Sequence, residues 1–296
     1  MALQAYLKEK REMVNRALDA CLPEEEGPAS RLVSAMRYSL FAGGKRLRPI
    51  LCMAGAEAVG GDPALVLPAA CALEFIHTYS LIHDDLPVMD DDDLRRGKPT
   101  SHKVFGDALA LLAGDGLLTE AFSLLSSPRL SERVAPQLVL RVIDLISGAA
   151  GHRGMVAGQA VDIQFEGKRA DAALLEFLHA HKTGALITAA VVSGAMLAGA
   201  DAARVRAMTE YGRKIGLAFQ ISDDILDIEG DTATLGKKTG ADEEKKKITY
   251  PSLMGLDRSG EIRSRLVTEA VNALKSFDHR ADPLREIARY IVERKK

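Results

Sequence analysis

Apolar residues recur along most of this 296-residue chain with the spacing of one face of an α-helix, and no run alternates as a strand does. Helix start signals divide this pattern, because Asp62-Pro63, Asp107, Asp171 and Asp201 each precede an apolar run. We therefore expect helices over 63–86, 107–125, 171–181 and 201–229, and further helices over 1–18, 30–42, 49–59, 133–148 and 260–277. The pattern predicts an all-α fold.

The composition is typical of closely packed helices. Apolar residues make up 47% of the chain and aromatic residues only 5%, with no Trp, so Ala and Leu must supply most of the core. No Pro-, Gly- or Ser-rich linker interrupts the chain, and we expect one domain over residues 1–296. Lys and Arg number 39 against 41 Asp and Glu, so no overall basic field favours nucleic acid.

Three features bear on location. The three cysteines are odd in number and lack metal-site spacing, which favours a reduced cytoplasmic protein over a disulfide framework. The first residues interleave charged with apolar side chains and lack the apolar core of a signal peptide. The longest nearly apolar stretch, Ala185 to Ala200, is shorter than the roughly 20 residues that cross a bilayer, so we expect a buried helix and no membrane span.

Two aspartate-rich boxes end apolar helical runs, where such charge is normally avoided. The first, Asp84 to Asp90, reads DDLPVMD, and the second, Asp223 to Asp227, reads DDILD. Clustered carboxylates repel one another unless a cation neutralises them. Mg²⁺ suits them because it binds a few carboxylates and fills its other positions with water and substrate phosphate. The boxes predict two walls of one cleft that holds a polyphosphate through bridging Mg²⁺.

Helical geometry ranks the aspartates within each box. Asp223 and Asp227 lie about 40° apart around a helix and face the same way, whereas Asp224 lies about 100° off that line and is a weaker candidate for a metal ligand. In the first box, Pro87 should end the helix, so that Asp90 can fold back beside Asp84. Three more aspartates follow Asp90, and spacing alone does not decide which late aspartate binds metal.

Basic segments flank both boxes. Gly43 to Pro49 reads GGKRLRP, a turn whose three cations can surround an anion with guanidinium and backbone N–H groups. Arg95-Arg96 follows the first box, His181 to Gly184 closes a helix, and Lys237-Lys238 follows the second box. This alternation of acidic and basic groups predicts a site for two anions, one held through metal and one held directly by cations.

These motifs together resemble those of the trans-isoprenyl diphosphate synthases, in particular the bacterial farnesyl diphosphate synthases. The resemblance extends over nearly the whole chain and follows the family's order, through the segments Gly43–Pro49, His77–Gly97, His181–Gly184, Phe219–Asp227 and Gly236–Lys238. It implies a helical bundle of the isoprenoid synthase type around a deep central cleft. It also implies a single polyprenyl synthetase domain and a homodimer.

The resemblance assigns roles to individual residues. The diphosphate of isopentenyl diphosphate would be bound by Lys45, Arg48, His77 and Arg96. The allylic diphosphate, from dimethylallyl or geranyl diphosphate, would be bound by Arg95, Lys182 and Lys237, with Thr183 and Gln220 lining the site. Mg²⁺ would be held by Asp84, Asp90 and Asp223, with support from Asp85, Asp224 and Asp227. The catalytic candidates are Lys182, Arg95 and Gln220.

The implied reaction is an ionisation, a condensation and an elimination. Fixed charges around the allylic diphosphate favour loss of pyrophosphate to leave an allylic cation, which the double bond of isopentenyl diphosphate attacks. No side chain is an obvious base for the final proton, and the resemblance suggests that pyrophosphate takes it. Tyr79 and Ser80 precede the first box by five and four residues, where bulk limits product length in this family. Tyr79 predicts the C15 product (2E,6E)-farnesyl diphosphate, and a geranylgeranyl diphosphate synthase is the nearest alternative.

Three other classes deserve comparison. Glu74-x-x-His77 and Glu176-x-x-His179 match the Glu-x-x-His pattern of helical di-iron carboxylate proteins, but that interpretation leaves both aspartate boxes unexplained. A non-catalytic partner subunit of a prenyl synthase could lose a ligand, yet every box is intact here. A class I terpene cyclase has little use for a second, cation-lined diphosphate site.

Overall fold

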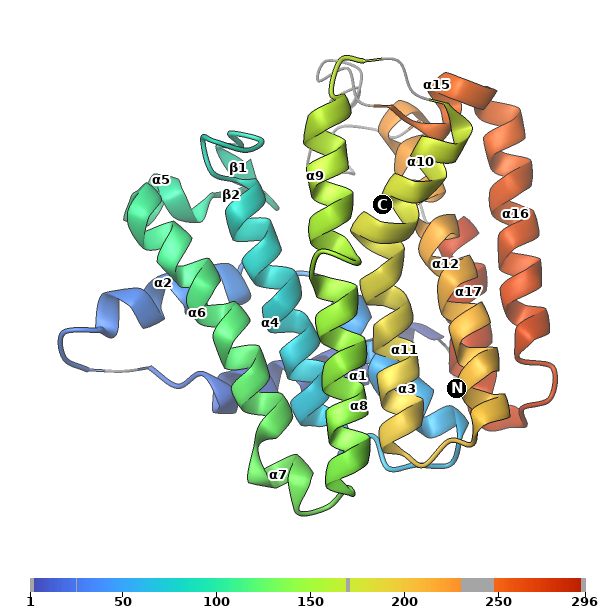
Figure 1. Cartoon of the computed structure of the whole chain (residues 1–296), viewed down its shortest axis with the longest axis horizontal. Coiled ribbons are helices and arrows are strands. Elements are labelled where there is room, and N and C mark those ends of the chain that lie inside the picture. The colour runs from blue at the N-terminus through green and yellow to red at the C-terminus, as the bar shows by residue number, and fades with distance from the viewer. Residues whose placement is uncertain (1–2, 25, 169–170, 230–247, 294–296) are drawn as a thin grey trace.

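The computed structural model describes residues 3–24, 26–168, 171–229 and 248–293, and these residues are almost all helical, as predicted (Figure 1). Within these ranges the strands are β1 (Leu94–Arg95) and β2 (Lys98–Pro99), which pair antiparallel in a short hairpin. This hairpin follows directly after the first aspartate box, so it presents Arg95 and Arg96 beside that box.

The helices of the first half surround α4, which carries the first aspartate box at its C-terminal end. α4 packs chiefly against α6, and it also contacts α3 and α1. In chain order, these helices are α1 (Leu3–Cys21), α2 (Ser30–Leu40), α3 (Leu47–Ala58), α4 (Leu67–Asp84), α5 (Ser101–Phe105), α6 (Asp107–Ser126) and α7 (Pro128–Ser131).

The second half adds the helices that face α4 and carry the second box. α11 packs against both α3 and α12, and α12 packs against α16. These elements are α8 (Pro136–Ala150), α9 (Met155–Phe165), α10 (Ala172–His179), the π-helix η1 (Ala180–Gly184), α11 (Ala185–Leu197), α12 (Ala202–Glu229), α15 (Tyr250–Met254), α16 (Leu256–Ala273), the 3₁₀ helix η2 (His279–Ala281) and α17 (Asp282–Glu293).

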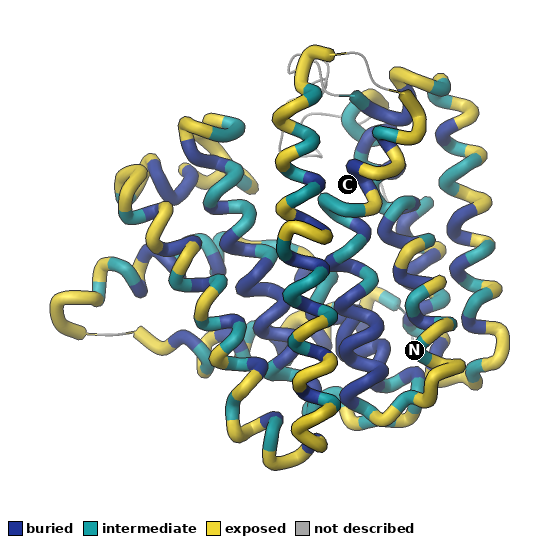
Figure 2. The backbone as a smooth tube through the Cα atoms, viewed as in Figure 1, coloured by how far each residue is buried: buried dark blue, intermediate teal, exposed yellow. Residues whose placement is uncertain are grey.

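The core is densest where α3, α4 and α11 meet, and Figure 2 shows these helices mostly in the colour of buried residues. α11 is buried along nearly its whole length, as expected for the apolar stretch that begins at Ala185. Its Gly194 packs directly on α3, because a Cβ added there would lie only 2.7 Å from the carbonyl carbon of Cys52. Small residues therefore let the central helices approach closely.

Two predicted helix caps are confirmed, and other predicted boundaries are wrong: Asp107 is the first residue of α6 and not its cap, and the helix predicted over 260–277 spans Leu256–Ala273. Asp171 and Asp201 cap their helices by accepting hydrogen bonds from the backbone N–H groups of Leu174, at 2.9 Å, and Arg204, at 2.8 Å. The helix predicted to begin at Pro63 begins instead at Leu67. Asp62 there accepts a 2.8 Å bond from the N–H of Ala64, so its side chain closes a local turn before the helix.

One described helical stretch, Asp107–Ser131, is long and apolar enough by composition to cross a bilayer, with a mean hydropathy of 1.5 in its most apolar window. About a third of that window, 33%, is buried inside the fold. A core helix passes the same test, so the stretch is only weak support for a membrane span.

Candidate active site

The first aspartate box closes back on itself at the end of α4. The helix ends at Asp84, and the backbone N–H of Asp90 donates a 2.9 Å hydrogen bond to the carbonyl oxygen of Asp84. The predicted fold-back of Asp90 is therefore confirmed. Burial raises the pKa of Asp84 to about 6, and the charge of Asp90 adds to this effect while Lys182 opposes it. The two carboxylates therefore lie close enough to repel each other, which favours a cation between them.

The second aspartate of this box has a different partner. The Asp85 side chain is buried and accepts hydrogen bonds from Nε of Arg95, at 2.8 Å to Oδ1 and 2.9 Å to Oδ2. Burial raises the pKa of Asp85, although its hydrogen bonds with Arg95 oppose the rise. In this structure Arg95 neutralises Asp85, so the two predicted site residues form an ion pair beside the Asp84–Asp90 carboxylates.

The GGKRLRP segment divides its cations between the core and the site. Arg46, in the left-handed backbone region at φ 54°, is buried and donates to Glu74 at 2.7 Å. Lys45 is exposed, whereas Arg48 lines a cavity within the bundle. Arg96 donates from its guanidinium to the carbonyl oxygen of Gly43. The pairing of Arg46 holds the loop in place, with Arg48 at the cavity and Arg96 bonded to Gly43, whereas Lys45 lines a separate pocket with residues of α1 and α17.

Arg48 and His77 share a buried corner whose positive charge is carried by Arg48, here called the cationic corner. The buried Nε of Arg48 has no hydrogen-bond partner among the described residues, and burial lowers the pKa of Arg48 to about 10, with Glu74 and Asp223 opposing the shift. Burial and the charge of Arg48 also hold the pKa of His77 well below its usual value. A buried donor without a partner is costly, so this corner is suited to bind an incoming anion.

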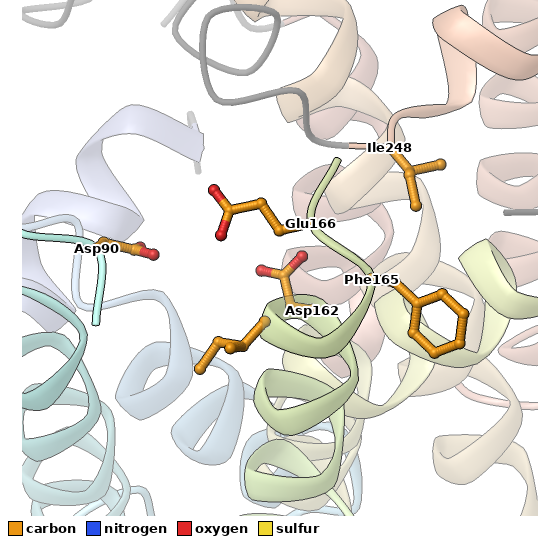
Figure 3. A pocket seen from close by; sticks show the side chains of 6 residues that line it. Asp90, Asp162, Phe165, Glu166 and Ile248 are labelled. Carbon is orange, nitrogen blue, oxygen red and sulfur yellow. The ribbon is translucent and has the colours of Figure 1, made fainter. Parts of the chain in front are cut away.

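The facing wall is made by α9 and the π-helix η1, and the sequence analysis did not single out α9. Lys182 on η1 donates to Asp162 on α9 at 2.5 Å. Gly158 allows this contact, because a Cβ there would lie 2.5 Å from the Cα of Lys182. π-helical turns are rare in proteins overall, and those that occur are often found at functional sites. Figure 3 shows Asp162 of α9 and Glu166, which follows that helix, on the side toward Asp90, whereas Phe165 points away.

The second box lies on α12 with its aspartates in different surroundings. Asp223 and Asp227 are partly exposed, as their shared helical face predicts, whereas Asp224 is buried. Asp223 lies close enough to Arg48 for its charge to raise the pKa of that guanidinium. One turn earlier, Gln220 accepts a 3.0 Å hydrogen bond from the hydroxyl of Thr183. The second box therefore approaches both the cationic corner and η1.

A cavity of about 400 Å³ is lined chiefly by residues of α3, α4, α9 and η1. Its charged and polar lining residues include Arg48, His77, Asp84, Lys182 and Thr183, and its other lining residues include Tyr79, Ser80, Leu81, Met89, Met155, Val156, Ala160 and Ile163. Gln159 also lines it, and in the described part of the chain neither its amide nitrogen nor its amide oxygen has a hydrogen-bond partner. The sequence analysis missed Gln159 and Asp162, although two polar residues three apart in an apolar helical run were the available signal.

Two further predictions remain to be compared with the structure. Lys237 lies outside the described residues. The di-iron hypothesis required Glu74 as a metal ligand, but Glu74 is paired with Arg46 in the core. Among the described residues, no group of three or more His, Cys, Asp or Glu side chains is gathered closely enough to hold a metal ion.

Comparisons with known proteins agree with this geometry. Residues 29–288 match the family model described as polyprenyl synthetase. Farnesyl diphosphate synthase of Geobacillus stearothermophilus is 50% identical over 278 residues, covering 94% of this chain and 93% of that protein. The large subunit 1 of a heterodimeric geranylgeranyl pyrophosphate synthase from Arabidopsis thaliana chloroplasts is 49% identical over 294 residues, covering 98% and 79%.

A solved structure extends the similarity to three dimensions. The geranylgeranyl pyrophosphate synthetase of Pyrococcus horikoshii superposes with a TM-score of 0.89 at 32% identity, over 99% of this chain and 98% of that one. The helical fold, the cavity beside the first acidic box and the family match all point the same way. This chain belongs to the polyprenyl synthetase family and is a trans-prenyltransferase.

Proposed function

We propose that the chain is a (2E,6E)-farnesyl diphosphate synthase, which condenses isopentenyl diphosphate with dimethylallyl or geranyl diphosphate and releases pyrophosphate. The observation that carries this proposal is the cavity between α4, α9 and η1. It is lined both by charged side chains, Arg48, Lys182 and Asp84, and by apolar ones, as a substrate with a charged head and a hydrocarbon tail requires. Its volume of about 400 Å³ falls within the usual range for small-ligand sites.

We infer Mg²⁺ as the cofactor. The donor set fits this ion, because Asp84 and Asp90 are close enough for one charge to raise the pKa of the other. When bound, Mg²⁺ would draw negative charge off the leaving diphosphate. Mg²⁺ is commonly held by one or two carboxylates and substrate phosphates, so it does not require a preformed cage of three side chains.

The chain's own side chains would bind and orient the two substrates. Arg48, whose Nε lacks a partner, and the neighbouring His77 are suited to the diphosphate of isopentenyl diphosphate. Lys182 is suited to the allylic diphosphate, which can compete with Asp162 for its ammonium group. The apolar lining excludes water from the reacting carbons. The proton lost at the end would pass to the departing pyrophosphate.

The C15 product length is supported by the residues below Asp84. Tyr79 is only 7% exposed and packs edge-on against His83, with ring centroids 5.6 Å apart. His83 in turn lies 3.0 Å, through Nε2, from the carbonyl oxygen of Leu111 on α6. His83 therefore supports the Tyr79 ring, which can act as a rigid barrier to the growing product. The smaller Ser80 leaves room for a chain longer than C10.

We also propose that the protein is a cytoplasmic homodimer. Large apolar side chains are exposed on neighbouring helices α5, α6 and α8, where Leu112 is 52% and Leu140 is 65% exposed. Such side chains are suited to a second copy of the chain. The three cysteines are free, which supports a reducing compartment. Size-exclusion chromatography with light scattering would measure the assembly.

One assay tests the proposed function. The purified chain is incubated with Mg²⁺, isopentenyl diphosphate and either dimethylallyl or geranyl diphosphate, and the products are separated by chain length. A C15 product is the expected result. A C20 product would keep the prenyltransferase chemistry but would establish a geranylgeranyl diphosphate synthase instead, as in the Arabidopsis relative. No product with either starter would contradict the proposal.

A further inference from the structure

Asp224 is the buried member of the second aspartate box. Its relative exposure is 2%, whereas Asp223 and Asp227 are partly exposed. Both of its carboxylate oxygens accept hydrogen bonds from the protein. Oδ1 accepts from Nε2 of Gln220 at 3.1 Å, and Oδ2 accepts from the backbone N–H of Tyr250 at 3.0 Å. Asp224 is therefore bonded within the fold and turned away from its two neighbours.

Two aromatic rings enclose this carboxylate from outside α12. Nε2 of His179, at the end of α10, lies 3.3 Å from Oδ2 of Asp224, which is an ion-pair distance without the alignment of a hydrogen bond. The rings of His179 and Tyr250 stack with centroids 5.5 Å apart. The carboxylate is thus held where α10, α12 and the start of α15 meet, and its position is set by three separate elements.

This carboxylate dictates which way the amide of Gln220 points. An amide has one donating end and one accepting end, whereas a carboxylate can only accept. Oε1 of Gln220 receives the hydroxyl hydrogen of Thr183 at 3.0 Å, and Nε2 faces Asp224. Rotating the amide by 180° would bring its oxygen against the carboxylate, so that two acceptors would meet. The carbonyl oxygen of Gln220 is consequently held on the side of Thr183, a residue that lines the cavity.

We propose that Asp224 is a positioning residue, which fixes the amide of Gln220 with its carbonyl oxygen toward the allylic subsite, and that it is not a ligand of the metal. The proposal rests on the proposed function, because a fixed negative dipole lowers the barrier only where positive charge develops on the substrate. Asp223 and Asp227 remain the metal-facing members of the box. The adjacent residues Asp223 and Asp224 thus have separate tasks, although both carry the same side chain.

The first test compares Asp224→Asn with Asp223→Asn in the full chain, by titrating Mg²⁺ in the product assay. Asparagine matches aspartate in shape but can donate, so the amide of Gln220 would be free to turn. Asp224→Asn is expected to lower kcat roughly 10- to 100-fold, with the Mg²⁺ concentration for half-maximal rate unchanged. Asp223→Asn should raise that Mg²⁺ concentration. A rise of the same size in Asp224→Asn would overturn the proposal.

A second test asks whether Asp224 acts through Gln220. In a Gln220→Leu background the amide is gone, so Asp224→Asn should cause no further loss of kcat. If the two residues acted independently, their separate losses of kcat would multiply. Multiplying losses would overturn the proposal. If circular dichroism shows that Asp224→Asn does not fold, His179→Phe replaces it in both tests. This substitution keeps an aromatic ring but removes the nitrogen beside Asp224. A kcat equal to that of the wild type would then overturn the proposal.

Controls separate this proposal from the proposed function. His279→Asn changes an exposed histidine in η2 and should leave kcat unchanged. If the wild-type chain makes no product from any allylic starter, the proposed function fails and the role of Asp224 fails with it. If the wild type is active and Asp224→Asn equals it in kcat, only the positioning role is overturned.

Discussion

The backbone of Asp90 is hydrogen-bonded to the backbone of Asp84 at 2.9 Å, which turns the chain back over the end of α4. The turn brings two carboxylates together, and burial with the charge of Asp90 raises the pKa of Asp84 to about 6. The backbone thus holds like charges near each other before any ligand arrives. A cation between them would lower the energy of the pair, so the turn prepares a site for one.

Asp84→Asn should abolish most turnover while leaving the fold intact. We expect a loss of roughly 10²- to 10³-fold in kcat, because a preorganised electrostatic contact is removed. Asp223→Asn should lose activity as well, through the second box. Asp93→Asn is the matched control, since Asp93 is exposed and pairs with Lys103 at 2.6 Å. Steady-state assays and thermal unfolding check this, and near-wild-type turnover of Asp84→Asn would contradict the metal assignment.

Tyr79→Ala should lengthen the product. The tyrosine ring lines the cavity and is backed by His83, so its removal opens space further along α4. We expect C20 or longer prenyl diphosphates, together with a loss of stability of about 3 kcal/mol from the deleted buried ring. Ser80→Phe is the opposite change and should shorten the product toward C10. Chromatography of the dephosphorylated products measures both, and an unchanged C15 product from Tyr79→Ala would rule out this residue as the barrier.

The sequence predicted the helical class and the Asp84–Asp90 turn, and it singled out Arg48 and Lys182, which line the cavity, because periodicity, proline and charge clusters are local signals. It did not show that Asp85 bonds Arg95 or that Asp224 is buried, since these depend on how β1, α10 and α15 pack. The contribution of α9 was also missed. Asp162 becomes a site residue only because Gly158 lets α9 approach Lys182, which no local pattern reveals.

Glu74→Gln should destabilise the protein strongly. Arg46 and Glu74 are each 3% exposed and pair at 2.7 Å, so the substitution leaves a buried guanidinium without its counter-charge. We expect a loss of about 3–5 kcal/mol in the free energy of unfolding, measured in urea. The double variant Arg46→Met with Glu74→Leu should lose far less, because it buries no unpaired charge. A loss below about 1 kcal/mol for Glu74→Gln would show that the pair is not a structural anchor.

Cys21 should be the most reactive thiol. Contact with the thiol of Cys71 lowers the pKa of Cys21 to about 7, assisted by Arg129, although burial opposes the shift. Burial raises the pKa of Cys52 to about 12. Because the thiolate is the reactive form, alkylation of Cys21 should speed up from pH 6 to 8 and then level off, while Cys52 stays unlabelled. Peptide mapping after iodoacetamide treatment checks this; equal labelling of both thiols would contradict it.

Gly158→Ala should impair the site more than its size suggests. The added methyl would lie 2.5 Å from the Cα of Lys182, so α9 and η1 must separate and Lys182 must shift from Asp162. We expect a loss of stability of about 1–3 kcal/mol and a higher KM for the allylic substrate. Gly260→Ala is the matched control on α16, where no atom lies within 4 Å of the new methyl. It should stabilise the protein by about 0.5–1 kcal/mol, because alanine favours the helix. If both variants keep the wild-type KM, close packing at Gly158 does not position Lys182.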